Sequence, residues 1–485
     1  MPATRVRAKV LAFAFLLAAV TYLDRICISA AAPFIMDDLH LSVVQMSVVF
    51  SAFTLAYSLF EVPSGWLGDV RGPRRVLTRI VLWWSAFTMM TGAARGFAPL
   101  VAIRFLFGAG EAGAFPNIAR SFSKWFPPRE RGRANGVMFL GSRIGGMLSA
   151  PIALLLVARW GWRPSFVAFG ALGIVWAIAW YVWYRDRPED HPAVNAEEIA
   201  WIRGDSRQGR DRGAESPAPQ AGVARPFPPS PNTSADHRSL GGGGQNPDRG
   251  AEIPAPQAGV ARPFQGRDLW RALLQSRNLY AICGMYFAFG YGLYFYFTWL
   301  PTYLIKVLGF SLLGGGLFAA LPFLLAGIAD LAGGWLTDRW SRARGLRAGR
   351  CHLGFGAFFT CALLVFASTL PVPAVVKALL LAMALASADL ALGACWAVPI
   401  DIAPDHAGVI TGCMNTLGNL GGLVGPLVLG LAVDRWHSWT FPFYVTAVIY
   451  ASGALAWLAI DPNQPIRVAD GTCQSRKRTA MNVAR

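Results

Sequence analysis

Long apolar segments recur along this chain, and they constrain its fold more than any other feature. A helix needs roughly 20 predominantly apolar residues to cross the hydrocarbon core of a bilayer, and about twelve segments reach that length. The expected spans are 9–35, 43–67, 76–95, 99–121, 132–157, 163–184, 276–304, 312–337, 351–370, 373–399, 407–433 and 438–460. Backbone polar groups inside lipid must be satisfied within the segment, which favours helices. The sequence predicts an all-α membrane protein of two six-helix bundles.

The charge pattern agrees with a membrane protein and argues against a nucleic-acid partner. Charged residues make up 15% of the chain, against about 25% in a typical soluble domain. The net charge of +17 comes from short basic clusters between apolar segments, and such clusters set membrane orientation by the positive-inside rule. We therefore expect both termini and the central loop on the cytoplasmic side of a bacterial inner membrane. The first apolar run is too long for a signal peptide, which predicts a retained helix.

Four regions follow from this pattern. They are an N-terminal bundle at 1–184, a central linker at 185–270, a C-terminal bundle at 271–462 and a basic cytoplasmic tail at 463–485.

The central linker is rich in Pro, Gly, Arg and Ser, which predicts disorder. Inside it, Asp211–Phe227 and Asp248–Phe264 form a direct repeat that differs at a single position. A passive expanded linker and a docking site both remain open for this repeat. The stretch Asn195–Arg203 before it is a candidate for a short surface helix.

The two apolar halves echo each other. The stretch from Glu61 to Asp69 matches the stretch from Asp330 to Asp338, because both contain an acid, then Gly-Trp-Leu, then Asp before a basic loop. Glycines and a proline between Gly136 and Pro151 recur in the same way in the second half. Parallel repeats of this kind occur in two-bundle transporters, whose substrate site lies between the halves near mid-membrane.

Ionisable side chains inside apolar segments single out the first half. Asp24 and Arg25 lie in the first segment, and Arg104 and Glu111 lie in the fourth. A charge near the bilayer centre costs roughly 2.5–3.5 kcal/mol on insertion scales, so retained charges usually pair with one another and line a water-filled path or a binding site. These four residues are candidates for such a site.

One loop resembles a motif of the major facilitator superfamily, and this resemblance covers nearly all of the chain except the central linker and the tail. The loop reads Gly65-Trp-Leu-Gly-Asp-Val-Arg-Gly-Pro-Arg-Arg75. Gly65 allows close helix approach. Asp69 can accept charge-assisted bonds at a helix N-terminus, and Arg74 holds the loop at the cytoplasmic face. Asp338 is the matching acid of the second half, and we expect a conformational or structural role for these residues.

Within that superfamily the chain resembles the anion:cation symporter family. The resemblance rests on Tyr22-Leu-Asp-Arg25, on Tyr57, on the stretch Arg104–Pro116 and on Ala403–Asn419. It implies a proton-coupled transporter that imports a small organic anion, such as a sugar acid or another carboxylate, by alternating access. It also implies that the protein is not an enzyme, needs no cofactor beyond the proton gradient and acts as a monomer in the lipid bilayer.

The four charges then take separate expected roles. Arg25 is the anion contact, since a guanidinium offers a fork that matches a carboxylate; a purely structural partner is the alternative. Arg104 and Glu111 share one helix face but lie about 10 Å apart along the axis, so each should meet a partner elsewhere. Proton carriage is favoured over a fixed ion pair for Glu111. The resemblance supports Asp24 as a second proton site, and Arg104 links protonation to substrate.

Polar and aromatic residues of both halves complete the expected site. The further candidates for substrate contact are Tyr57, Ser142, Tyr291, Tyr294, Trp396, Asn415 and Asn419. Arg143 is either a third anion contact or the partner of an acid such as Glu61. Glu61 and Asp330 match through the repeat, which favours a structural role, whereas Asp389 has no assigned role. The seven cysteines show no metal-ligand spacing, so no metal site is expected.

Two other functions compete with anion import. A proton-coupled drug exporter of the same fold often has a Gly-Pro pair in its fifth helix, but the corresponding stretch here is Ser149-Ala-Pro151. Arginines in the cavity also suit anions better than cationic drugs. A non-transporting membrane sensor would use the central linker as its output arm, and counterflow exchange in vesicles discriminates it from a transporter.

Overall fold

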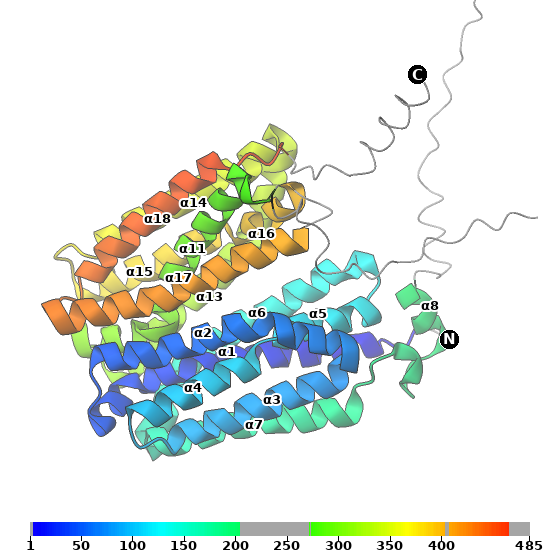
Figure 1. Ribbon diagram of the computed structural model, residues 1–485, viewed down its shortest axis with the longest axis horizontal. Helices are drawn as coiled ribbons and strands as arrows, with labels where there is room; N and C mark the ends of the chain where they lie inside the picture. The colour runs from blue at the N-terminus through cyan, green and yellow to red at the C-terminus, as the bar shows by residue number, and fades with distance from the viewer. Residues whose placement is uncertain (1–2, 204–270, 272, 403–406, 465–485) are drawn as a thin grey trace, which may run out of the picture.

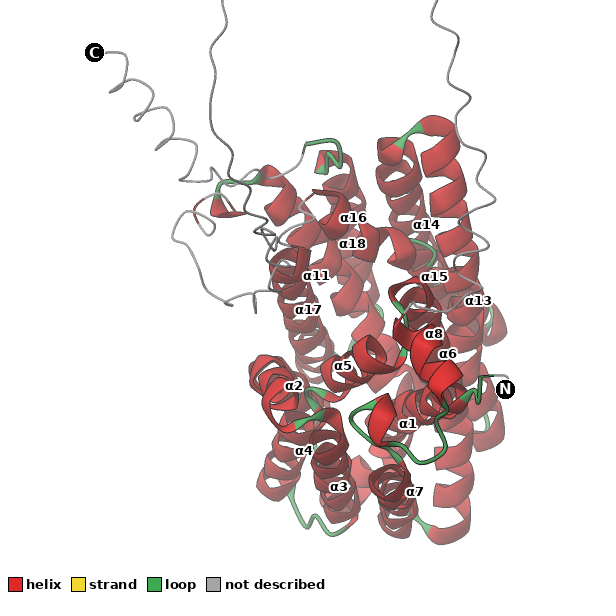
Figure 2. Ribbon diagram, turned by 90° about the vertical axis from the view of Figure 1, so that its right-hand side faces the viewer, coloured by secondary structure: helices red, strands yellow, loops and turns green. Residues whose placement is uncertain are grey.

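The computed structural model describes residues 3–203, 271, 273–402 and 407–464. The direct repeat and most of the basic tail lie outside these residues, as do the contacts of Gly65 and of the Asp69 side chain, so the corresponding expectations stay predictions. Within the described residues the chain forms helices and connecting loops and no strand (Figure 2). The predicted all-α class is confirmed.

The first half contains seven helices where six spans were expected. Their bounds are α1 Val6–Leu39, α2 Val43–Arg71, α3 Pro73–Gly92, α4 Phe97–Glu111, α5 Ala114–Trp125, α6 Pro128–Trp160 and α7 Trp162–Trp183. The expected span 99–121 is divided into α4 and α5 because the backbone turns at Gly113, whose φ is 97°. A Cβ atom at this position would collide with Ser64 of α2, so glycine is required both by its conformation and by the space available.

Short elements connect this half to the second one. The 3₁₀ turn η1 covers Pro188–Asp190, and α8 covers Ala196–Arg203, which confirms the short helix expected near that position. The second half consists of α11 Arg277–Thr298, α12 Leu300–Thr302, η2 Tyr303–Val307, α13 Leu312–Arg344, η3 Ala348–His352, α14 Leu353–Ala367, α15 Ala374–Asp389, α16 Leu392–Ile402, α17 Ala407–Trp436 and α18 Phe441–Ala459. The tenth expected span is therefore broken too, between α15 and α16.

Ten helical segments of the described residues are long and apolar enough to cross a membrane. The two expected spans that are not among them are α3 and α11. Arg79 and several Thr and Trp residues lower the apolar character of α3, and tyrosines do the same for α11. Both helices pack along other spans, α3 against α7 and α11 against α17, so each lies within its helix group.

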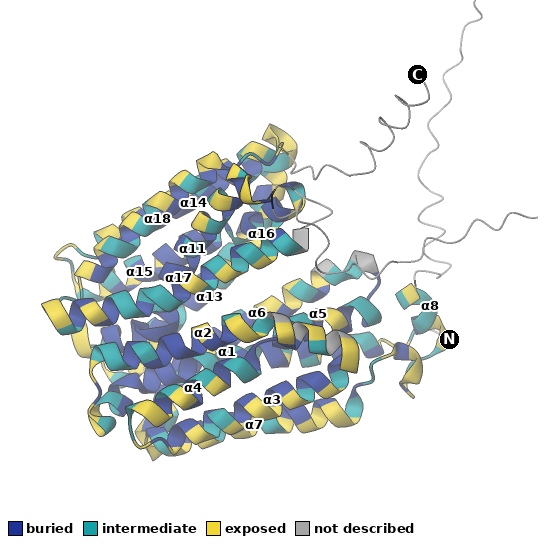
Figure 3. Ribbon diagram, in the orientation of Figure 1, coloured by how far each residue is buried: buried dark blue, intermediate teal, exposed yellow. Residues whose placement is uncertain are grey.

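The helices lie in two groups side by side (Figure 1). In the first group α6 packs along α1, and in the second α18 packs along α14. Contacts of α2 with α17 and of α6 with α13 join the groups. Outward-facing sides of the helices carry many exposed residues (Figure 3). The exposed residues of the molecule include large apolar side chains such as Leu155, Leu313 and Val448, which are 67%, 69% and 68% exposed. Exposed apolar side chains on helices long enough to cross a membrane fit contact with lipid.

Polar contacts hold the two halves together at the end of the molecule opposite the N-terminus. The carboxylate of Asp434 on α17 accepts hydrogen bonds from the backbone N–H groups of Val43 and Val44, at 3.2 and 3.0 Å. The Lys306 ammonium lies 2.7 Å from Asp37 Oδ2. The Asp434 bonds satisfy two donors at the start of α2, as a helix cap does. This end is closed by contacts between the halves.

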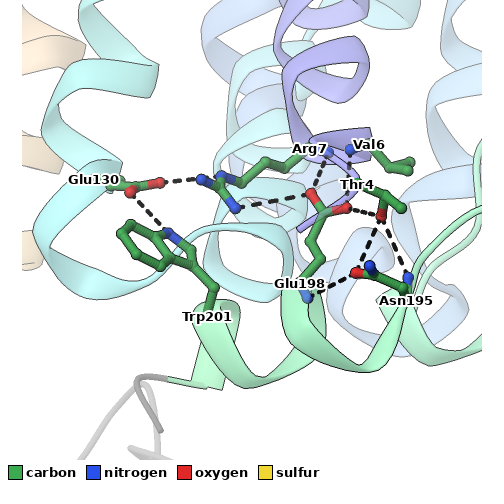
Figure 4. Close-up of polar contacts among 7 residues, drawn as sticks. All are labelled: Thr4, Val6, Arg7, Glu130, Asn195, Glu198 and Trp201. Carbon is green, nitrogen blue, oxygen red and sulfur yellow. Dashed lines mark hydrogen bonds and ion pairs between the residues drawn. The ribbon is translucent and has the colours of Figure 1, made fainter. Parts of the chain in front are cut away.

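A buried carboxylate fastens α8 to the N-terminal end of the first group (Figure 4). Glu198 is fully buried and accepts hydrogen bonds from Thr4 Oγ1 at 2.6 Å, from the Val6 N–H at 2.9 Å and from the Arg7 N–H at 3.0 Å. The side chain of Arg7 continues the network to Glu130 of α6 at 3.3 Å. The segment after α7 therefore caps α1 and connects it to the start of α6.

We expect Glu198→Ala to destabilise the protein by about 1–3 kcal/mol, because buried N–H groups of α1 lose their acceptor. The measurement is the thermal unfolding midpoint of the purified protein in detergent. Glu197→Ala is the matched control, since Glu197 is the exposed neighbour on the same helix. Equal unfolding midpoints for the two variants would contradict the capping role.

Candidate functional site

A cavity lies between the two halves, with an empty volume of about 1010 Å³ that includes space open to solvent. Helices α1, α2, α5 and α6 line it from one side, and α11, α13, α16 and α17 line it from the other. The predicted substrate contacts that line it are Arg25, Tyr57, Ser142, Tyr294, Trp396, Asn415 and Asn419. The structure thus brings together residues that are separated by nearly 400 positions in the sequence.

Tyr291 is the exception among the predicted contacts. It is not part of the cavity lining and is buried, with its ring 6.4 Å from that of Phe287 and its backbone against Gly425 of α17. Three residues correspond to about 300° around a helix, so Tyr291 points roughly 60° away from Tyr294. That rotation separates the directions of the two side chains, and Tyr291 does not line the cavity as its predicted role requires.

Arg25 and Glu111 form a direct ion pair at the cavity wall. Arg25 Nε donates to Glu111 Oε1 at 3.0 Å, and Nη2 contacts the same oxygen. Glu111 Oε2 is buried and has no hydrogen-bond partner among the described residues. The guanidinium also lies over the rings of Tyr22, Phe53 and Tyr57, about 5 Å from each centroid. Arg25 lines the cavity whereas Glu111 lies behind it.

The sequence of α4 explains how this pair forms. Gly108 lies so close to the Phe53 carbonyl of α2 that a Cβ atom would collide with it, so the two helices approach closely at this level. Glu111 is the last residue of α4, directly before the break at Gly113. The close approach and the break together hold the Glu111 carboxylate against α1.

Asp24 and Arg104 lie behind the cavity and not in its wall. The Trp84 indole donates to Asp24 Oδ2 at 3.1 Å, and Asp24 Oδ1 has no hydrogen-bond partner among the described residues. The Arg104 guanidinium lies 4.3 Å from the centroid of the Phe107 ring, within electrostatic range of Asp24 and Glu111. Arg104 and Glu111 were each expected to meet a partner on another helix. Glu111 does so, because it pairs with Arg25 of α1.

Glu61 lines the cavity, although its match to Asp330 in the repeat favoured a structural role. Asn415 Nδ2 donates to its two carboxylate oxygens at 3.1 and 3.4 Å, which connects α2 to α17 across the cavity. Asn419, one turn further along α17, also lines the cavity, and its Nδ2 has no hydrogen-bond partner among the described residues. It is therefore available to donate to a bound oxygen.

A second charged cluster joins the halves at Arg143. Its Nε donates to Asp330 Oδ2 at 2.7 Å, and its Nη2 lies 3.0 Å from Asp389 Oδ2. From the sequence, pairing with an acid was one of two roles considered for Arg143, but neither Asp330 nor Asp389 was identified as that acid. The only available signal was the presence of three ionisable residues in apolar segments, and their pairing depends on the packing of α6 against α13, which sequence spacing does not reveal.

Arg74 and Asp338, which were predicted to have structural roles, make polar contacts near the helix ends. Arg74 donates to the Tyr181 carbonyl from Nε at 2.9 Å and from Nη2 at 2.7 Å, which joins α3 to α7. Asp338 lies 3.3 Å from Arg350 Nη1, and Arg350 Nε also contacts Asp401 of α16 at 3.1 Å.

Two groups of membrane helices that enclose a charged cavity define a membrane transporter. A family model confirms this class: the model of the Major Facilitator Superfamily matches residues 14–426, and the chain belongs to this family. The protein is thus a multi-pass membrane transporter and not an enzyme.

Curated relatives are transporters of organic acids. A probable sulfoacetate transporter of Cupriavidus necator is 32% identical over 91% of this chain and 91% of its own length. A hexuronate transporter of Bacillus subtilis is 27% identical, with 92% and 93% covered, and a probable L-galactonate transporter of Escherichia coli is 29% identical, with 95% and 90% covered. The predicted resemblance to anion symporters is confirmed.

Among solved structures, a bacterial homologue of the human lysosomal transporter Spinster, in an inward-facing and unoccupied conformation, matches with a TM-score of 0.68. The match covers 93% of this chain and 96% of that chain at 16% identity. At this level of identity the likeness shows the fold.

Proposed function

We propose that this protein is a proton-coupled symporter that imports a small organic anion by alternating access. It acts as a monomer in a bacterial inner membrane, with its N-terminal end on the cytoplasmic side. In the described conformation the opposite end is closed by Asp434 and Lys306, so the cavity is reached from the cytoplasmic side. The substrate is a sugar acid or another carboxylate, in keeping with the acids named for the relatives.

The Arg25–Glu111 pair carries the proposal. Arg25 is a permanent cation in the cavity wall, and its Nε and Nη2 groups are occupied by a carboxylate of the protein itself. A substrate carboxylate and the Glu111 carboxylate therefore compete for one guanidinium. A proton that binds Glu111 removes its negative charge and releases Arg25 for the substrate. Protonation of Glu111 frees the Arg25 guanidinium, and the free guanidinium binds the substrate anion more tightly. The proton and the anion therefore bind cooperatively.

The charged residues next to Arg25 and Glu111 support the same coupling between proton binding and substrate binding. Asp24 is fully buried and is proposed as a second proton site. Arg104 lies within electrostatic range of Asp24, Glu111 and Arg25, so a change of charge at any of them alters its interaction with the other two. Arg104 is the proposed link between substrate occupancy and protonation. Asn419 and Tyr294 line the cavity from the second half, which supports a role for them in bonding substrate hydroxyl groups.

Uptake by proteoliposomes tests this function. The probes are labelled sulfoacetate, glucuronate and galactonate, and the expected result is accumulation of at least one of them when the outside is acidic. A protonophore should abolish that accumulation and leave exchange of the same probe intact. Uptake that is the same with and without the proton gradient would refute proton coupling, and a requirement for a sodium gradient would replace the proton by sodium.

A further inference from the structure

The second half contains a buried acid that matches Glu111 in position. Glu111 ends α4, directly before the break in the fourth span, and Asp389 ends α15, directly before the break in the tenth span. The fourth and tenth spans correspond in the repeat of the two halves. Each acid is fully or almost fully buried, at 1% and 0% exposure, and each lies against one arginine. Broken helices of this kind mark ion and substrate sites in transporters.

The charges around Asp389 do not balance. Arg143 is the cation of the cluster, and both Asp330 and Asp389 lie against it, so the cluster carries one excess negative charge when both acids are ionised. The carboxylate of Asp389 has no hydrogen-bond partner among the described residues apart from this ion pair. A buried ion costs several kcal/mol in desolvation unless a partner offsets it. One guanidinium offsets one carboxylate, and the second carboxylate remains uncompensated.

The other titratable groups near Asp389 do not offset the excess negative charge of the cluster. From the helices packed around it, the neighbouring side chains are Tyr286, Tyr296, Cys361, Cys395 and Tyr450. Tyrosine and cysteine are ordinarily uncharged near neutral pH, so none of them supplies a positive charge. The end of α15 adds backbone carbonyls, and their partial negative charge also favours a proton on the acid.

We propose that Asp389 is a further proton-coupling site, in the half opposite Glu111 and Asp24, and that Asp330 passes protons between the cavity and Asp389. This inference rests on the proposed proton-coupled function. Asp330 lines the cavity and its side chain is 23% exposed, whereas Asp389 is closed off from water. A hydronium ion in the cavity breaks one of its O–H bonds and leaves as water, while its proton forms an O–H bond on the Asp330 carboxylate. That O–H bond breaks as a new one forms on Asp389, so the cluster changes from a charge of −1 to zero, and release of the proton to water reverses both steps.

Arg143 makes this site sensitive to the movement of the two halves. Its helix, α6, belongs to the first half, and both aspartates belong to the second. Rocking of the halves changes the distance between the guanidinium and the acids. A cluster without excess charge separates and re-forms at lower electrostatic cost than a charged one. Protonation of Asp389 is therefore coupled to the conformational exchange itself.

The thermodynamic accumulation ratio tests the proposal. With the membrane potential clamped at zero, the equilibrium ratio of a transported probe changes tenfold per coupled proton and per pH unit, because one pH unit corresponds to 1.36 kcal/mol per proton. Asp389→Asn fixes the neutral form, so at a gradient of one pH unit we expect a ratio about tenfold below wild type. The probe is whichever of sulfoacetate, glucuronate and galactonate the wild type accumulates. An unchanged ratio would overturn the proposal.

Asp401→Asn is the matched control, because Asp401 belongs to α16, which follows the same break, and pairs with an arginine, Arg350, outside the cavity lining. Its equilibrium ratio should equal that of the wild type. If Asp389→Asn does not fold, Asp330→Asn serves instead, because it leaves a balanced pair of Arg143 and Asp389 that no longer takes up a proton. We expect the same tenfold loss, and a normal ratio in that variant would equally overturn the proposal.

Infrared difference spectra separate this inference from the proposed function, because they need no substrate. A pH change should produce a carboxylic-acid C=O band in the wild type that Asp389→Asn lacks and Glu111→Gln keeps. If this band is found but the wild type shows no proton-driven accumulation, the transport proposal fails and the protonation of Asp389 stands. A band that survives in Asp389→Asn would overturn the assignment of the proton to Asp389.

Discussion

Arg25→Lys is expected to weaken binding of the transported acid by roughly tenfold to a hundredfold. A hydrogen bond to a charged group contributes about 1.5–3 kcal/mol, and each 1.4 kcal/mol is a factor of ten in affinity. Lysine keeps the positive charge but loses the planar fork that can hold a carboxylate in two places. Arg25→Gln also removes the charge, so we expect no measurable binding and no uptake from that variant.

Calorimetric titration of the purified protein measures the effect, with whichever of the three probes the wild type transports. The matched control is Arg159→Gln on α6, which removes an exposed arginine outside the cavity and should leave affinity unchanged. Thermal unfolding of each variant separates loss of binding from loss of fold, because Arg25→Gln leaves Glu111 buried without its cation. Wild-type affinity in a folded Arg25→Lys protein would show that the anion binds elsewhere.

The fold could be predicted from the sequence because bilayer thickness imposes a length on every span. The apolar runs located the spans, and the repeat of Glu61–Asp69 in the second half indicated two similar halves. Breaks within spans were not predicted. Gly113 adopts a left-handed conformation and lies so close to Ser64 of another helix that a Cβ atom would collide with it, and that neighbour is visible only after the helices pack.

The candidate site, like the fold, could be predicted from the sequence only in part. Residue type and burial cost singled out Arg25 and Glu111, but their direct pairing depends on the close approach of α2 and α4 at Gly108. Tyr291 was misplaced because spacing along a helix gives relative direction and not the direction of the cavity. Asp389 remained unassigned because its partner, Arg143, comes from the other half of the molecule.

Glu111→Gln is expected to separate substrate binding from proton coupling. Glutamine has nearly the shape of protonated glutamic acid and cannot release a proton, so Arg25 stays available to the substrate at every pH. Counterflow exchange of a transported acid between the two sides of a vesicle should continue, because it needs no net proton movement. Accumulation driven by a proton gradient through this site should be lost.

Affinity measured against pH gives the second readout of this variant. In the wild type a proton must displace the Glu111 carboxylate from Arg25, so the affinity for the anion should fall by up to tenfold per pH unit as Glu111 ionises. In Glu111→Gln that dependence should flatten. Glu189→Gln is the control, since it removes a carboxyl in η1, outside the spans, and should keep both coupling and pH dependence. A Glu111→Gln protein that accumulates substrate like the wild type would exclude Glu111 as a coupling acid and leave Asp24 and Asp389 as the remaining buried candidates.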